Sequence, residues 1–194
     1  MGVLAVRRFA RRYPAVSISV VEEITPILLD RLHNGHVDIV VLALPVRGEE
    51  LISEELFREP LFAALPQDHP LAERKSLTLG EIREDPFLLL KEGHCFRENA
   101  LSACRRSRVS PNVVFESGQF STIVSMVATG VGVSVVPAMA VERHPGCKFV
   151  RINDERAVRI VGLAQLKHRF KTRAQCALTE QLRRYAQTCL VVPD

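Results

Sequence analysis

Residues 126–137 read MVATGVGVSVVP and place the end of one helix directly before a buried strand. The helix is expected to run to Ala128, because apolar residues recur at helical spacing and Gly130 supplies a common C-terminal stop. The valine-rich run Val131–Val136 is typical of a strand covered on both faces. Gly130 and Gly132 follow a helix and open a strand, which is the reverse of a dinucleotide-binding fingerprint, so no such cofactor site is predicted.

Outward from this unit, helix and strand signals alternate along the chain, which predicts an α/β architecture with mostly parallel sheets. Helices are expected at Val3–Arg12, Pro26–Asn34, Phe96–Arg106, Gln119–Ala128 and Arg173–Cys189, with a short one capped by Thr78 and Glu81. Further strands are expected at Ser17–Glu22, Ile39–Leu44, Leu61–Leu65, Phe87–Leu90, Val113–Phe115 and Ile160–Leu166.

The composition is that of a globular protein with an aliphatic core. The chain has 194 residues, 47% of them hydrophobic and only 6% aromatic, and its formal net charge is +4. That charge is too small to indicate a nucleic-acid-binding domain, and the group Arg7, Arg8, Arg11 and Arg12 is interpreted as a solvated helix face. No run reaches the ~18 apolar residues of a membrane span, and the N-terminus lacks the pattern of a signal peptide. We therefore expect a cytoplasmic protein.

Four stretches resemble the effector-binding domain of LysR-type transcription regulators, and the resemblance covers nearly the whole chain. They are Val37–Val41, Leu56–Leu61, Asp68–Leu71 and Met126–Pro137. The resemblance implies a two-lobe fold like that of type 2 periplasmic binding proteins, with a cleft between the lobes. By analogy, lobe I would be 1–59 plus 163–194 and lobe II 60–162. The chain would cross between the lobes near Glu59 and Gly162.

Within that family, Glu92–Glu98 followed by Cys104 resembles the sensing segment of the peroxide-responsive members. The resemblance implies that Cys95 reacts with hydrogen peroxide and that Cys104 resolves the product as a disulfide. It also implies a peroxide pocket that includes Thr25, His94, Arg97 and Arg159. For Thr25 the plainer interpretation is a helix N-cap, and for Arg159 it is a surface charge on a strand edge. Val113–Phe115 stands where such members carry a further pocket histidine.

The spacing of the two cysteines itself suggests a switch. If Phe96–Arg106 is helical, Cys95 lies at the N-terminus of that helix, where the helix dipole favours a thiolate and where His94 and Arg97 can add donors or positive charge. Cys104 would lie about 13 Å further along the axis on the opposite face. A disulfide needs Cα atoms within ~7 Å, so the helix would have to unwind first. The alternative is that both cysteines are small core residues.

The remaining cysteines lack a reactive context, and we interpret Cys147, Cys176 and Cys189 as packing residues. His144 and Cys147 are too few for a zinc site, which usually needs four ligands, so neither a metal nor a cofactor is predicted. Five cysteines in a reducing compartment are not expected to form structural disulfides.

The resemblance also implies parts that this sequence does not supply. Neither the helix-turn-helix DNA-binding domain nor the linker helix of the family is expected here, and the chain is expected to begin inside the first helix of lobe I, without the strand that opens that lobe. Contacts with DNA and RNA polymerase would then require the full-length protein, as a homodimer or higher oligomer.

The sequence leaves three functions open. The first is a hydrogen-peroxide-sensing regulatory domain that switches by a Cys95–Cys104 disulfide and is not an enzyme. The second is a LysR-type domain that binds a small organic effector in the inter-lobe cleft, with incidental cysteines. The third is a thiol peroxidase with turnover, which the fold resemblance disfavours.

Overall fold

The computed structural model describes residues 2–188, which divide into two compact units. Unit 1 comprises the residues up to Arg58 and those from Ile160 on, and unit 2 comprises Glu59–Arg159. The chain therefore passes between the units twice, at Arg58/Glu59 and at Arg159/Ile160. The sequence-based expectation put the second crossing at Gly162.

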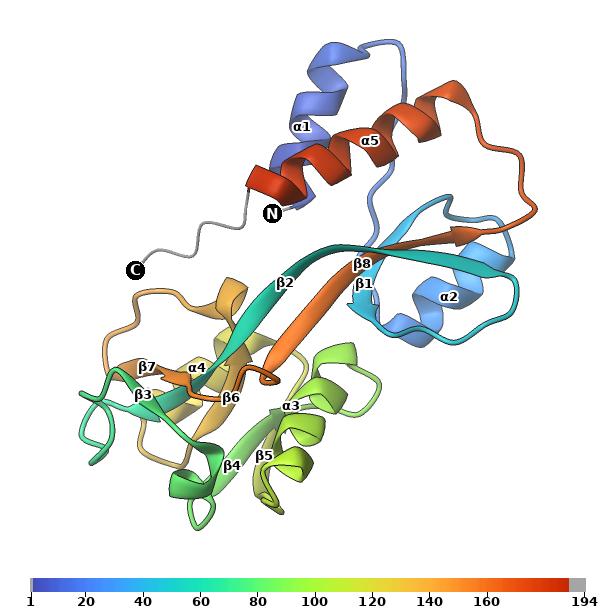
Figure 1. Cartoon of the computed structure of the whole chain (residues 1–194). Coiled ribbons are helices and arrows are strands. Elements are labelled where there is room, and N and C mark those ends of the chain that lie inside the picture. The colour runs from blue at the N-terminus through green and yellow to red at the C-terminus, as the bar shows by residue number, and fades with distance from the viewer. Residues whose placement is uncertain (1, 189–194) are drawn as a thin grey trace. The chain divides into compact units, whose positions relative to one another are not determined.

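Unit 1 contains α1 (Gly2–Arg12), α2 (Thr25–His33), β1 (Val40–Leu44) and α5 (Arg173–Thr188), with parts of two long strands, β2 (Leu51–Pro66) and β8 (Val158–Leu166). β1 pairs antiparallel with β8, α2 packs on β1, and α1 packs along α5 (Figure 1). Two small apolar clusters lie in this unit, one around Leu32 and Leu42 and the other around Phe57 and Ala186.

Unit 2 holds the remaining elements. They are β3 (Ser76–Leu77), η1 (Leu79–Ile82), β4 (Pro86–Leu90), α3 (Cys95–Arg106), β5 (Asn112–Ser117), α4 (Phe120–Ala128), β6 (Ser134–Pro137), η2 (Ala138–Ala140) and β7 (Cys147–Ile152). The far half of β2 pairs antiparallel with β6 and β7, while β3 pairs parallel with β7 and β4 pairs parallel with β5. The largest core of the chain fills this unit, and α3 and α4 contribute to it.

The α/β class is confirmed, but the sheets are not mostly parallel as expected. Parallel pairing occurs in β4–β5 and β3–β7, whereas β2 and β8 make antiparallel ladders. Long strands that carry the chain from one unit to the other and back run in opposite directions, which explains why the sheet that contains them is largely antiparallel.

The expected strand at Ser17–Glu22 is wrong, because this segment is irregular. Of its β-branched residues, Val20 is 70% exposed and Val21 is also exposed, while Ile18 is only partly buried. A strand is defined by a hydrogen-bonded neighbour as well as by its residues, and this segment belongs to no ladder of the described part of the chain. The first half of β2 and all of β7 were not expected from the sequence.

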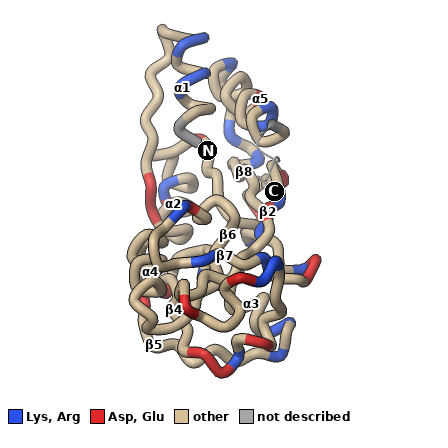
Figure 2. The backbone as a smooth tube through the Cα atoms, turned by 90° about the vertical axis from the view of Figure 1, so that its left-hand side faces the viewer, with Lys and Arg blue, Asp and Glu red and all other residues tan. Residues whose placement is uncertain are grey.

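The four arginines of α1 are exposed, in agreement with a solvated face. Figure 2 marks the basic positions along the backbone of α1 in blue. The interpretation of Cys176 as a packing residue is wrong, because it is exposed on α5. Cys147 is buried in β7 as expected, while Cys189 lies outside the described residues. None of the described helices is long and apolar enough to cross a membrane.

Candidate functional site

The N-terminus of α3 is built by a local turn and a histidine cap. Gly93 has a φ of 86°, a conformation that favours glycine, and the His94 amide donates to the Lys91 carbonyl at 3.2 Å. His94 is the N-cap, and its Nδ1 accepts the Phe96 amide at 3.3 Å. Cys95 is consequently the first residue of the helix, in the field of its unsatisfied amides, and it is half-buried.

The cap also defines which nitrogen of His94 holds a proton. Because Nδ1 accepts a hydrogen bond, the neutral ring carries its proton on Nε2, which is then available as a donor. The ring meets the edge of Phe120 of α4, with the centroids 5.7 Å apart. His94 is thus held beside Cys95 by both the helix and α4.

Cys104 has a contrasting environment on the same helix. Its side chain is fully buried in the core of unit 2, and burial raises the pKa of its thiol to about 11. Cys104 is nine positions after Cys95 in the intact helix, so the two lie about 13 Å apart along the axis and on opposite faces. Both are thiols in this conformation.

Arg97 ties α3 to the two strands beneath it. Its Nη1 donates to the Leu90 carbonyl at the end of β4 at 2.7 Å and to Oε1 of Glu116 in β5 at 2.5 Å. The charge of Arg97 is therefore compensated by a carboxylate. Glu116 was not identified from the sequence, because nothing in its local pattern marks it as a partner of a residue 19 positions away.

Arg159 is not the surface charge that one sequence interpretation allowed, since it is only 6% exposed. Its guanidinium pairs with Glu59, with Nε 2.6 Å from Oε1, and lies over the ring of Phe96 with Cζ 5.5 Å from the centroid. Phe96 directly follows Cys95. The structure therefore brings Arg159 against the first turn of α3, together with Glu59, which the sequence analysis missed.

Thr25 belongs to unit 1, whereas Cys95, His94, Arg97, Arg159 and Cys104 belong to unit 2. The N-cap interpretation of Thr25 is wrong, because Ile24 holds the N-cap position without a side-chain bond and Thr25 is the first residue of α2. Pro26 in the first turn supplies the start signal of this helix, so a capping hydroxyl is not required.

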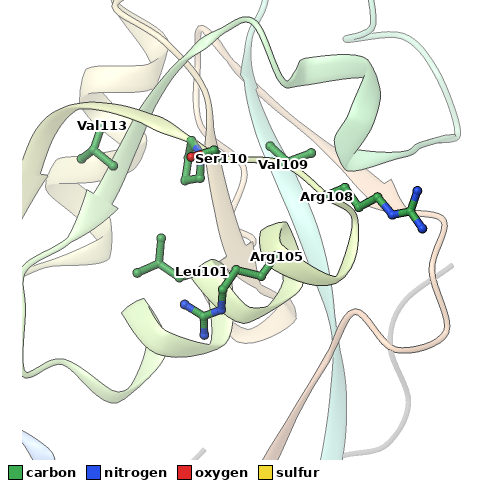
Figure 3. A pocket seen from close by; sticks show the side chains of 7 residues that line it. Leu101, Arg105, Arg108, Val109, Ser110 and Val113 are labelled. Carbon is green, nitrogen blue, oxygen red and sulfur yellow. The ribbon is translucent and has the colours of Figure 1, made fainter.

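A pocket of about 450 Å³ lies at the other end of α3 (Figure 3). Leu101 and Arg105 line it from α3, residues 108–111 line it from the segment that leads into β5, and Val113 lines it from β5. It contains none of the residues predicted for the peroxide pocket. No cluster of three metal-ligating side chains occurs within residues 2–188.

Comparison with known proteins identifies the fold. The chain matches the LysR substrate binding domain over residues 3–187. It is 33% identical over 163 residues to the uncharacterized HTH-type transcriptional regulator YybE of Bacillus subtilis, which covers 84% of this chain and 56% of that one. It is 33% identical over 129 residues to the DNA-binding transcriptional dual regulator OxyR of Escherichia coli, which covers 66% and 42%.

Among solved structures, the reduced form of the OxyR regulatory domain from Pseudomonas aeruginosa superposes with a TM-score of 0.79 at 32% identity, covering 92% of this chain and 88% of that one. The chain spans about half the length of the curated relatives it matches. The residues that match the family extend over both α/β units. The chain belongs to the LysR substrate binding domain family.

Proposed function

We propose that this chain is the redox-sensing regulatory domain of a hydrogen-peroxide-responsive LysR-type transcription factor. The observation that carries the proposal is the position of two cysteines on one helix, Cys95 half-buried at its first residue and Cys104 buried nine residues later. Similarity to proteins named hydrogen peroxide-inducible genes activators supports it.

The chemistry would proceed in two balanced steps. The Cys95 thiolate attacks one oxygen of hydrogen peroxide, an S–O bond forms as the O–O bond breaks, and the departing hydroxide takes up a proton to give water. The Cys104 sulfur then attacks the Cys95 sulfenic acid, so that the S–S bond forms, the S–O bond breaks, and water leaves with the thiol proton.

Helix α3 prevents the second step until it unwinds. A disulfide needs Cα atoms within about 7 Å, and the intact helix keeps these two residues nearly twice as far apart. Oxidation of Cys95 would therefore favour a different fold of residues 95–104. A local chemical event would be converted into a change of shape.

The other pocket residues have proposed roles. The Nε2 proton of His94 is a proposed donor for a peroxide oxygen. Arg97 and Arg159, each paired with a carboxylate in this conformation, are proposed to contribute hydrogen bonds near Cys95. The Thr25 hydroxyl is a proposed donor to the leaving oxygen. In the full-length regulator, a homodimer in the cytoplasm, the shape change would alter contacts with DNA and RNA polymerase. Cellular thiols would reduce the disulfide, so the domain is a switch and not a turnover enzyme.

A peptide mass map before and after one equivalent of hydrogen peroxide tests the proposal. We expect a new Cys95–Cys104 linkage that is absent in Cys95→Ser and retained in Cys176→Ser, a matched control with an exposed cysteine outside α3. If both thiols survive in folded protein, the redox proposal fails and the binding of a small organic effector becomes the function to test. Sustained peroxide consumption beyond one equivalent with a thiol reductant would instead indicate a peroxidase.

A further inference from the structure

The ion pair between Glu59 and Arg159 is the most completely buried charged contact described in unit 2. Glu59 is 5% exposed and Arg159 is 6% exposed. Oε1 of Glu59 accepts Arg159 Nε at 2.6 Å, and Oε2 accepts the amide of Met139 at 2.9 Å. Both carboxylate oxygens are therefore used.

Such a pair is held in one geometry. Two buried charges recover their desolvation cost only when the contact is close and the remaining polar atoms are bonded, so any displacement of either partner is costly. Glu59 lies in β2 and Arg159 in β8, and both strands are fixed by backbone ladders. The Arg159 guanidinium is consequently held in a fixed position.

The ring of Phe96 packs against the guanidinium of Arg159. Its ring lies 5.5 Å from Arg159 Cζ and 5.1 Å from the ring centroid of Phe120, and it is 1% exposed. A desolvated cation over an aromatic face is one of the stronger contacts that such a ring makes. Because Phe96 is the residue after Cys95, it lies inside the segment that must refold for Cys104 to reach Cys95.

We propose that Glu59 and Arg159 form a positioning pair that holds Phe96, and with it the first turn of α3, in the reduced conformation. This inference rests on the proposed disulfide switch. The pair acts on the second step, in which Phe96 must leave the guanidinium. Glu59 thereby sets how long the sulfenic acid persists before the disulfide forms.

The decisive variant is Glu59→Gln, which keeps the size and an acceptor but removes the charge that holds Arg159. We expect the rate of disulfide formation to rise roughly tenfold, the scale of one desolvated cation–π contact. The rate of sulfenic acid formation is measured separately, by trapping with a cyclic diketone in the Cys104→Ser background, because Arg159 is also a proposed pocket residue. A rise in disulfide formation no larger than the change in this first rate would overturn the inference. Glu55→Gln, on the same strand and also paired to an arginine but exposed, should change neither rate.

A double-mutant cycle distinguishes positioning from general weakening of the fold. Quenched-flow mass spectrometry would follow disulfide formation in wild type, Glu59→Gln, Phe96→Leu and the double variant. Non-additive effects on the rate are expected, because both substitutions remove the same contact. Additive effects, or an unchanged rate in Glu59→Gln, would overturn the inference.

If Glu59→Gln is unfolded by circular dichroism, Arg159→Lys takes its place in the same cycle, since lysine keeps the charge but loses the planar face over Phe96. If wild type itself forms no Cys95–Cys104 disulfide, the proposed function fails. A wild-type disulfide with no coupling between Glu59 and Phe96 defeats only the positioning pair.

Discussion

Two thiols of the same residue type differ here because of where the helix places them. Cys95 is half-buried at the amide end of α3, whereas Cys104 is enclosed by the core of unit 2. Burial disfavours a thiolate, and the pKa of Cys104 is accordingly raised to about 11. Cys104 is thus a poor nucleophile until α3 opens, which keeps the buried thiol from reacting before Cys95 is oxidised.

The raised pKa predicts a pH dependence of stability. The unfolded thiol ionises near 9.0 and the folded one near 11, so the stabilising contribution of Cys104 is complete below pH 9 and lost as the pH rises to 11. The loss should be on the order of 2 kcal/mol. Urea unfolding under reducing conditions at pH 8 and pH 11 measures it.

Cys104→Ala should reduce this pH dependence without abolishing it, because burial also raises the pKa of the Cys147 thiol to about 11. Cys176→Ala, at an exposed position, is the control. The quantity to compare is the difference in unfolding free energy between pH 8 and pH 11 within each variant, since lysines and tyrosines titrate in the same range. Equal pH dependence in wild type and Cys104→Ala would contradict the burial argument.

The residues of the site divide into those that sequence could reveal and those that it could not. Cys95 and Cys104 stand out because their spacing on a predicted helix is a local property. The Glu59–Arg159 pair spans 100 positions and the Arg97–Glu116 pair spans 19, and neither partner has a local pattern. Such pairs arise from the sheet pairing, which brings distant residues together.

At the scale of elements, α3 combines strong packing with a weak point. Phe96, Ala100, Ala103 and Cys104 are buried in the core. Between them, Oδ1 of Asn99 is buried and has no hydrogen-bond partner. A buried carbonyl without a donor costs about 1–3 kcal/mol, and asparagine is also a poor helix former. The helix is therefore less stable than its apolar face alone would make it.

Asn99→Ala should stabilise the reduced domain by on the order of 1 kcal/mol, because it removes the buried carbonyl and improves helix propensity. The same change should slow disulfide formation several-fold, since α3 must unwind. Chemical denaturation and the quenched-flow assay measure the two effects. Asn112→Ala at the exposed start of β5 is the control. A stabilised helix with an unaltered rate would mean that the disulfide forms without unwinding α3.

Most elements were predicted from the sequence because caps, glycine stops and apolar periodicity are local signals. The helices α1 to α5 all match expected segments within a few residues. The strands that were predicted wrongly or not at all depend on pairing with distant strands. The first half of β2 carries several exposed and charged residues and lacked a strand pattern, yet β2 is a long connecting strand. Ser17–Glu22 had the pattern of a strand but belongs to no ladder of the described structure.

At the scale of the molecule, the apolar cores are separate. The large core draws all its members from unit 2, whereas the clusters around Leu32 and Phe57 lie in unit 1. Within residues 2–188, the chain passes between the units in β2 and in β8. Loss of packing in one core therefore does not directly remove contacts from the others.

This separation predicts how the oxidised form differs from the reduced one. Refolding of residues 95–104 withdraws Phe96 and the buried face of α3 from the unit 2 core, and loss of one buried phenylalanine alone costs about 3–5 kcal/mol. Hydrogen exchange followed by mass spectrometry should show faster exchange in α3 and β4 after one equivalent of peroxide, while β1 and α2 keep their rates. Cys104→Ser, which can form the sulfenic acid but not the disulfide, should show much smaller changes in β4. If β1 and α2 lose protection as much as β4 does, the two units unfold as one cooperative body, and the switch acts on the whole domain rather than through unit 2.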